Sequence, residues 1–499
     1  MALDMQWFQD MEARIPTGEV RTRFAPSPTG YMHVGNLRTA LYTYLIARHL
    51  GGKFLLRIED TDQGRLVDGA VDVIYATMRQ CGLTWDEGPD VGGPVGPYVQ
   101  TERRPFYGKY AQLLVEKGAA YYCFCEKAES EEDSGEFDRA ADPCRDLTPA
   151  QVKEKLDAGL PYVIRQRIPA GKTTFSDAVY GDITVDNSDL DDQVLIKRDG
   201  LPTYNFANVV DDHLMGITHV VRGAEYLSSA PKYNLLYEAF GWEVPTYGHC
   251  ATVMITDPQT GTVRKMRKRH GDPSYEDLMA QGYLSQAVVN YVALLGWAPH
   301  GELSEQEFFT MDELIAAFEI SGISKSPSAF DMDKLTYFNA AYLRALTPEQ
   351  FARAARPYIR KAVQNEAYDA DAIAALLQAR CEKLTDIPEK VDFFDALPEY
   401  SAELFTNKKS KTDAEVSLRM LEAVSPVLSA LPDWSQDAIH DALVALAERL
   451  GVKNATLMWP LRIAAAGKAV TPGGAVELCR ILGRDETLRR IALGMDKLK

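Results

Sequence analysis

The spacing of apolar residues changes character near residue 300 of this chain. Before that point, short apolar runs typical of strands alternate with stretches of helical spacing; after it, the spacing is helical almost throughout. Residues 20–25 and 53–59 are the first two predicted strands, and Leu37, Leu41 and Leu45 fall at helical spacing between them. A strand, a helix and a second strand in this order predict a parallel sheet with crossover helices.

The later patterns extend this division into a mixed front half and a helical back half. Further strands are predicted near 162–168, 182–185, 193–197 and 217–222, and helices at 230–240, 348–363, 371–384 and 436–450. A chain of 499 residues is too long for one core. We therefore expect an extension at 1–20, an α/β domain in two halves at 21–118 and 193–300, an inserted subdomain at 119–192, a helical segment at 301–340 and a helical domain at 341–499.

Composition narrows the class of protein without identifying it. The chain is 46% apolar and 25% charged, as is typical of a globular protein. It has no apolar run long enough to span a membrane, and residues 1–20 lack the apolar segment of a signal peptide. Seven cysteines are too few for a disulfide framework and favour the reducing cytoplasm. A net charge of −17 argues against nonspecific binding of nucleic acid, but local basic patches can still bind it.

Residues 21–36, RTRFAPSPTGYMHVGN, are the most informative stretch. A predicted strand ends in a loop rich in Pro and Gly, and a helix begins near Asn36, a good N-cap residue. A helix N-terminus beside a strand end is a ready anion site. The imidazole of His33 can donate to a phosphate, and Gly35 lets a nucleotide approach. His-x-Gly alone, however, is more often a tight turn with a surface histidine.

Residues 264–271, RKMRKRHG, hold five cations and a histidine. They form either a solvated basic loop or a set of cations that neutralises charge as a phosphate group leaves.

Several segments can contribute to a pocket with both signs of charge. Residues 57–62, RIEDTD, end a strand with carboxylates that can hold an ammonium group. Arg222 ends another strand and can bind a carboxylate through two hydrogen bonds. Residues 202–212 supply hydroxyl and amide groups. Each segment alone is ordinary, since a charged residue at a strand end is usually a surface ion pair.

In their joint order these segments resemble the bacterial glutamyl-tRNA synthetases, which are class I aminoacyl-tRNA synthetases. The string APSPTG followed by His-x-Gly resembles the first class I signature, and Lys265 to Arg269 resembles the Lys-Met-Ser-Lys-Ser signature, with Arg267 in place of a serine. The resemblance covers nearly the whole chain from residue 21. It implies a Rossmann-like catalytic domain, an inserted subdomain that binds the tRNA acceptor end, and an all-α anticodon-binding domain.

The resemblance also implies an activity and a set of residues. Glutamate would be activated with ATP and Mg²⁺ and transferred to tRNA-Glu, with activation waiting for tRNA, by a monomeric enzyme. The residues implied to bind glutamate are Arg23, Ala25, Ser27, Glu59, Tyr204, Asn208 and Arg222, of which Arg222 would read the γ-carboxylate. The residues implied to bind ATP are His33, Gly35, Glu225, Lys265 and Lys268. Of these, His33, Gly35, Lys265 and Lys268 form the implied catalytic set.

Two further features leave alternatives open. Cys123 and Cys125 would share one face of a strand, and some relatives bind Zn²⁺ through Cys-x-Cys and a later Cys-x-His; this chain has Cys144 with Asp146 in the histidine's place. Either these residues bind zinc, or the cysteines are simply reduced and bind no metal. The second alternative is open because structural zinc favours sulfur and nitrogen ligands, whereas an aspartate supplies oxygen. Arg380 falls near the anticodon-reading arginine of some relatives, or it is an ion pair on a helix surface.

Two rival functions are less consistent with the sequence. A small-molecule nucleotidyltransferase that shares the His-x-Gly signature usually lacks a long helical second half, which residues 340–499 form here. A non-catalytic tRNA-binding relative is suggested by Arg267, but the joint presence of His33, Glu59, Lys265 and Lys268 argues against it.

Overall fold

The structure, a computed structural model, describes residues 3–125, 142–257, 260–266 and 271–499. It divides into two compact units, and each is described by itself. Unit 1 comprises Met1–Leu278 and Val288–Met332, and unit 2 comprises Met279–Ala287 and Asp333–Lys499. The limits of the smaller domains expected from the sequence stay a prediction.

A six-stranded sheet forms the centre of unit 1, in the order β2-β1-β8-β9-β5-β6. Its strands are β1 (Arg21–Phe24), β2 (Lys53–Leu56), β5 (Lys172–Asp177), β6 (Gly181–Asp186), β8 (His219–Gly223) and β9 (Thr246–Cys250). The neighbours from β2 to β5 run parallel, and β6 is an antiparallel edge strand. Helix α2 (Val34–His49) connects β1 to β2, which confirms the predicted strand–helix–strand start.

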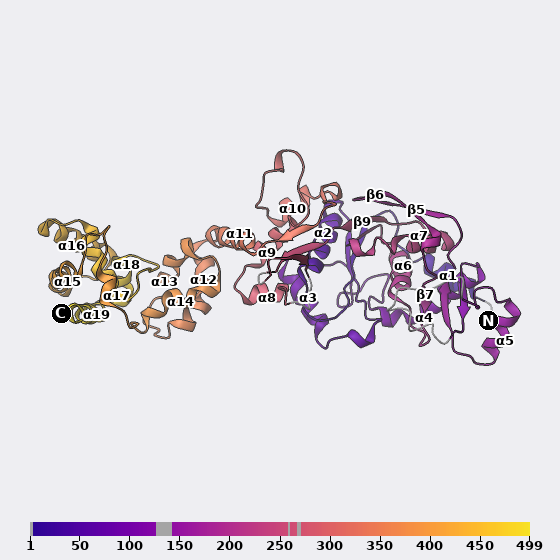
Figure 1. The fold of residues 1–499 in the computed structure, drawn as a ribbon, viewed down its shortest axis with the longest axis horizontal. Helices are drawn as coiled ribbons and strands as arrows, with labels where there is room; N and C mark the ends of the chain where they lie inside the picture. Colours follow the sequence, from indigo (N-terminus) through magenta and orange to yellow (C-terminus); the bar gives the residue numbers. More distant parts are fainter. Residues whose placement is uncertain (1–2, 126–141, 258–259, 267–270) are drawn as a thin grey trace. The chain divides into compact units, whose positions relative to one another are not determined.

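Further helices precede residue 318 in the chain (Figure 1). They are α1 (Met5–Glu12), α3 (Ala70–Gln80), α4 (Arg104–Glu116), α5 (Pro149–Asp157), α6 (Tyr204–Leu214), α7 (Ala230–Phe240), α8 (Tyr275–Ala280), α9 (Ser285–Ala293) and α10 (Met311–Ala317). Helix α7 has the predicted bounds. The predicted extension includes α1, whose Phe8 and Met11 are buried in the core of unit 1.

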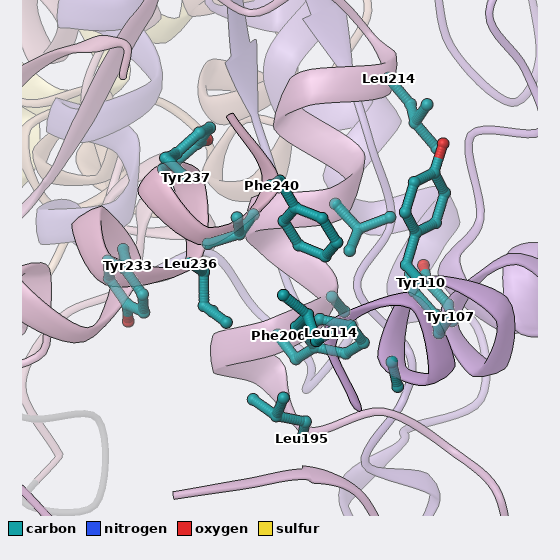
Figure 2. Close-up of a cluster of buried hydrophobic side chains, with 14 of the residues drawn as sticks. Tyr107, Tyr110, Leu114, Leu195, Phe206, Leu214, Tyr233, Leu236, Tyr237 and Phe240 are labelled. Carbon is teal, nitrogen blue, oxygen red and sulfur yellow. The ribbon is translucent and has the colours of Figure 1, made fainter. Parts of the chain in front are cut away.

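Helix α6 is fixed by a core of aromatic and aliphatic side chains (Figure 2). Its Phe206 and Leu214 pack there with side chains of α4 and α7, such as Tyr107 and Phe240. Tyr204, Asn208 and Asp212 are spaced by four, so they follow one another along a different face of the helix. Apolar packing thus fixes the direction in which a row of polar side chains points.

Two small sheets complete unit 1. One consists of β3 (Ala120–Cys123), β4 (Val163–Gln166) and β7 (Val194–Ile196), and the other of β11 (Val263–Lys265), β10 (Val253–Thr256) and β12 (Ser328–Phe330). The range expected for an inserted subdomain therefore contributes both to the β3-β4-β7 sheet and, through β5 and β6, to the six-stranded sheet.

The described residues of unit 2 form helices and no strand, as the spacing of apolar residues predicts (Figure 1). The helices from residue 332 onward are α11 (Met332–Ala345), α12 (Pro348–Ala362), α13 (Ala370–Leu377), α14 (Ile387–Val391), α15 (Ala414–Ser429), α16 (Gln436–Leu450), α17 (Asn454–Ala466), α18 (Ala475–Leu482) and α19 (Arg484–Leu498). Helix α13 is shorter than the predicted stretch 371–384, because short 3₁₀ turns follow it.

None of the helices in the described part of the chain combines the length and the apolar character needed to cross a membrane.

Candidate active site

A pocket of about 370 Å³ opens where β1, β8 and β9 end. In open α/β sheets, ligands bind outside the carboxyl ends of the strands, so this is the expected position for a site. The residues expected from the sequence that line the pocket are Arg23, Ala25, Ser27, His33, Gly35, Glu59, Tyr204, Arg222, Glu225 and Lys265. Segments far apart in the chain are thus brought to one place.

The first motif places a histidine at the start of α2. His33, not Asn36 as expected, is the N-cap, and its Nδ1 accepts a hydrogen bond of 3.0 Å from the backbone N–H of Gly35. Since Nδ1 accepts, the neutral ring carries its proton on Nε2, which can donate to an anion. A Cβ at position 35 would lie 3.1 Å from Nδ1, so glycine there lets the ring fold over the helix end.

The carboxylate expected to hold an ammonium group, that of Glu59, is buried and paired. Arg57 donates to its Oε1 at 3.1 Å, and Gln100 lies 3.5 Å from the same oxygen. Burial raises the pKa of Glu59, although the charges of Arg57 and Arg23 act in the opposite direction. A positively charged ligand group would favour the ionised form, so Glu59 suits the recognition of an ammonium group.

Arg222 is buried but only partly satisfied by the protein. Its Nη2 donates to Asn208 Oδ1 at 2.7 Å and lies 3.4 Å from Asp212 Oδ2, and the guanidinium lies over the ring of Tyr233. Its Nε and Nη1 are buried and have no hydrogen-bond partner within the described residues. Because a buried donor without a partner is costly, two donors on the wall of a pocket indicate a site for a carboxylate.

Of the other site residues expected from the sequence, one lies on the pocket wall, one lies behind it, and one is outside the described residues. Asn208 does not line the pocket but anchors Arg222 and donates to the backbone oxygen of Tyr204 at 2.8 Å. Lys265, at the end of β11, lies on the pocket wall with its Nζ 3.7 Å from Glu225 Oε2. Lys268 and Arg267 lie outside the described residues.

Sequence reasoning missed the carboxylate behind the pocket, that of Asp212. It is 1% exposed and accepts hydrogen bonds from Arg23 and Arg57. Burial alone would raise the pKa of Asp212, but the charges of these two arginines hold it well below its usual range. The only sequence signal was its place four residues after Asn208 on a helix.

The cysteines expected to bind zinc lie close together. Ligand atoms of Cys123, Cys125, Cys144 and Asp142 all lie within 4.8 Å of one another. The Sγ atoms of Cys125 and Cys144 are 3.7 Å apart, and Asp142 Oδ1 is 3.6 Å from Cys125 Sγ. A tetrahedral zinc with Zn–S bonds of about 2.3 Å would place two sulfurs about 3.8 Å apart, so the donor set fits the ion.

The fourth donor differs from the sequence expectation. Asp146, expected in the place of a histidine, has a side chain that is 94% exposed and lies 3.9 Å from Arg167. Asp142 instead faces the thiols, because its Oδ1 accepts the backbone N–H of Cys144 at 2.8 Å and its Oδ2 accepts the hydroxyl of Tyr121. The structure therefore places Asp142, and not Asp146, beside the three thiols.

In unit 2, Arg380 lies beside a second arginine. Arg380 Nη1 donates to the backbone oxygen of Thr471 at 2.8 Å, and Arg462 donates to Thr471 Oγ1 at 3.3 Å and stacks over Trp459. Burial, reinforced by the charge of Arg380, lowers the pKa of Arg462. In the described part of the chain Arg380 has no carboxylate partner, so the alternative of a surface ion pair is not seen.

Two neighbouring arginines near the C-terminus, Arg489 and Arg490, are already paired within unit 2. Both Arg489 and Arg490 donate to Glu486, and Arg490 also donates to backbone oxygens of Phe393 and Ala465. Arg490 is 0% exposed, so it stabilises unit 2 and is not available to bind an anion.

Comparisons with known proteins agree with the fold. Residues 19–337 match the family described as the catalytic domain of class I tRNA synthetases (E and Q), and residues 350–495 match an anticodon-binding domain. The chain belongs to this family of class I tRNA synthetases.

Within the family, the chain is similar to proteins named glutamate–tRNA ligase. It is 57% identical to one from Clostridium botulinum over 97% of this chain and 99% of the relative, and 54% identical to one from Clostridium acetobutylicum over 96% and 99%. A solved glutamate tRNA ligase from Elizabethkingia meningosepticum, in complex with its amino acid, is 33% identical, with a TM-score of 0.82 over 97% of this chain and 100% of the solved chain.

Proposed function

We propose that this protein is a glutamate–tRNA ligase, which activates glutamate with ATP and transfers it to the terminal adenosine of tRNA-Glu. The observation that supports the substrate best is Arg222, a buried arginine on the pocket wall with two unfilled donors. Arg23 adds a second cation and Glu59 an anion on the same wall. A ligand with two carboxylates and one ammonium group has the charges that these residues complement.

The two small substrates would bind in different parts of the pocket. Arg222, Tyr204 and Glu59 lie on one part of the wall, where the γ-carboxylate and the ammonium of glutamate would bind. His33 at the N-terminus of α2 and Lys265 at the end of β11 would bind the phosphates of ATP. The α-carboxylate of glutamate then attacks the α-phosphorus, pyrophosphate leaves, and a hydroxyl of the terminal adenosine attacks the mixed anhydride. Positioning and fixed positive charge supply most of the rate.

Mg²⁺ would enter with ATP and screen the charge of its phosphates. Magnesium at such sites is usually held by substrate phosphates with one or two protein carboxylates. Glu225, whose side chain is 51% exposed on the pocket wall, fits that pattern.

The proposal extends to the tRNA, the cell compartment and the oligomeric state. Arg380 and Arg462 on unit 2 would contact the anticodon, since unit 2 contains the segment that matches an anticodon-binding domain. Activation would wait for tRNA, and the enzyme would act as a monomer. Its seven cysteines form no disulfide in the structure, which suits the cytoplasm.

The experiment that tests the function is ATP–pyrophosphate exchange driven by glutamate. We expect exchange with purified tRNA-Glu present and little without it, because activation waits for tRNA. A parallel reaction with tRNA-Gln decides whether that tRNA is charged as well. Glutamate that supports no exchange under any of these conditions would overturn the proposal and favour a non-catalytic tRNA-binding role.

Replacing Arg222 should weaken the binding of glutamate selectively. For Arg222→Ala we expect the KM for glutamate to rise by about 10- to 150-fold, since hydrogen bonds to charged groups contribute about 1.5–3 kcal/mol. The KM for ATP should change little, because Arg222 lies with the glutamate-binding residues. Steady-state aminoacylation with each substrate varied in turn measures both constants, and an equal rise in the two would refute this assignment.

We also propose that Cys123, Cys125, Cys144 and Asp142 bind one structural zinc ion. When bound, the ion would cross-link the end of β3 to the segment at 142–144 and so stabilise this part of the fold. The donors fit a tetrahedral site, although a carboxylate is a less common fourth ligand than histidine.

Metal analysis of purified protein should show one zinc per chain. Cys123→Ser and Asp142→Ala should lower the zinc content or the affinity for zinc, because each removes a donor. Asp146→Ala is the matched control and should keep the metal, since that side chain is exposed and away from the thiols. Zinc-free wild-type protein, or equal loss in the Asp142 and Asp146 variants, would contradict the proposed site.

The role proposed for Arg380 predicts weaker binding of tRNA. In Arg380→Ala we expect the KM for tRNA to rise by about tenfold, because loss of an arginine contact to a base costs about 1–3 kcal/mol. The matched control is Arg489→Ala, which removes an exposed arginine of the same unit that is already paired with Glu486. Aminoacylation at varied tRNA concentration measures both variants, and equal effects would remove Arg380 from the proposed contact.

A further inference from the structure

Behind the pocket wall lies a connected network of buried charges. It links Arg103, Asp211, Gln100, Glu59, Arg57, Asp212, Arg23 and Arg222 through hydrogen bonds. Its charged members are all at most 5% exposed. Such a network would be costly to bury if any member were unpaired, so each carboxylate has a specific set of partners.

Asp212 is the point where three arginines of this network meet. Its Oδ1 accepts from Arg23 Nε and from Arg57 Nη1, both at 2.8 Å. Its Oδ2 accepts from Arg23 Nη2 at 3.1 Å and lies 3.4 Å from Arg222 Nη2. The carboxylate does not line the pocket, but two of its three arginine partners do.

We infer that Asp212 is a positioning residue for glutamate: it orients the guanidinium groups of Arg23 and Arg222 so that their remaining donors face the pocket. The inference rests on the proposed function, since it names what holds the glutamate-binding arginines in place. Arg23 is held by two hydrogen bonds on one side of its guanidinium, which fixes its plane. Arg222 is held at Nη2 by Asn208 and Asp212, which leaves Nε and Nη1 for a ligand.

Asp211, the neighbour of Asp212, distinguishes the positioning of pocket arginines from the mere burial of a negative charge. Asp211 precedes Asp212 on α6 and is equally buried, but its hydrogen bonds go to Arg103, Gln100 and Tyr107, none of which lines the pocket. Its distance to Arg57 Nε is 3.9 Å, beyond hydrogen-bond range. Changing either aspartate to asparagine removes one buried negative charge from the same network, yet only Asp212 contacts pocket arginines.

The test compares Asp212→Asn with Asp211→Asn in the full chain. We expect Asp212→Asn to raise the KM for glutamate by about 10- to 100-fold, because misplaced arginines lose hydrogen bonds to charged groups. The KM for ATP should stay within about twofold, and Asp211→Asn should change neither constant by more than that. A KM does not depend on how much of the enzyme is folded, so partial loss of stability does not mimic this pattern.

Asp212→Glu is the second variant if the asparagine variant does not fold. It keeps the charge but moves the carboxylate by one methylene, so we expect a smaller but clear rise in the KM for glutamate and none for ATP. An unchanged KM for glutamate in the Asp212 variants, or an equal rise in Asp211→Asn, would overturn the inference while leaving the proposed function intact. Wild-type enzyme that does not charge tRNA with glutamate would overturn the proposed function, and the inference with it.

Discussion

The arginines behind and along the pocket wall must satisfy two opposing requirements. They are buried and need a counter-charge, yet some of their hydrogen-bond donors must stay available for a ligand. Arg23, Arg57 and Arg222 are at most 5% exposed, and a buried guanidinium needs a counter-charge to be stable. A counter-charge that used every donor would leave none for a substrate. The carboxylate of Asp212 resolves the conflict, since it holds both nitrogens of one side of Arg23 but only one nitrogen of Arg222.

The apolar core makes this arrangement possible. Helix α6 is fixed by Phe206 and Leu214 against side chains of α4 and α7, and the same helix carries Asn208 and Asp212 (Figure 2). Loss of packing there would rotate or shift the helix and so move the hydrogen-bond acceptors of Arg222. Core packing and the geometry of the pocket wall are thus coupled through one helix, because a close-packed interior transmits small displacements.

The sequence predicts the first strand–helix–strand unit of the sheet and most of the residues that line the pocket. It does not predict the buried charges behind the pocket wall. His33 and Gly35 are two residues apart and interact with each other, and Arg222 and Glu59 stand at or just after strand ends, so local patterns reveal them. Two of the three arginine partners of Asp212, Arg23 and Arg57, are 189 and 155 residues away, and no local pattern encodes those contacts. Asp142 was missed for a different reason: a turn in which its side chain accepts the N–H of Cys144 points it toward the thiols, while Asp146 is exposed.

The two unfilled donors of Arg222 also bear on how glutamate would be distinguished from glutamine. A γ-carboxylate brings a negative charge and two acceptor oxygens to Nη1, one of the two donors without a partner, whereas an amide offers one oxygen and turns N–H donors toward a guanidinium that has no acceptor. Glutamine would therefore leave a buried charged donor unpaired, and it would place two sets of donors against each other. Sites that reject a ligand in this way can discriminate by about 10⁴-fold without a separate editing step. Selectivity for glutamate would then follow from the donors of Arg222 that have no partner in the protein. The burial of these same donors is unfavourable for folding.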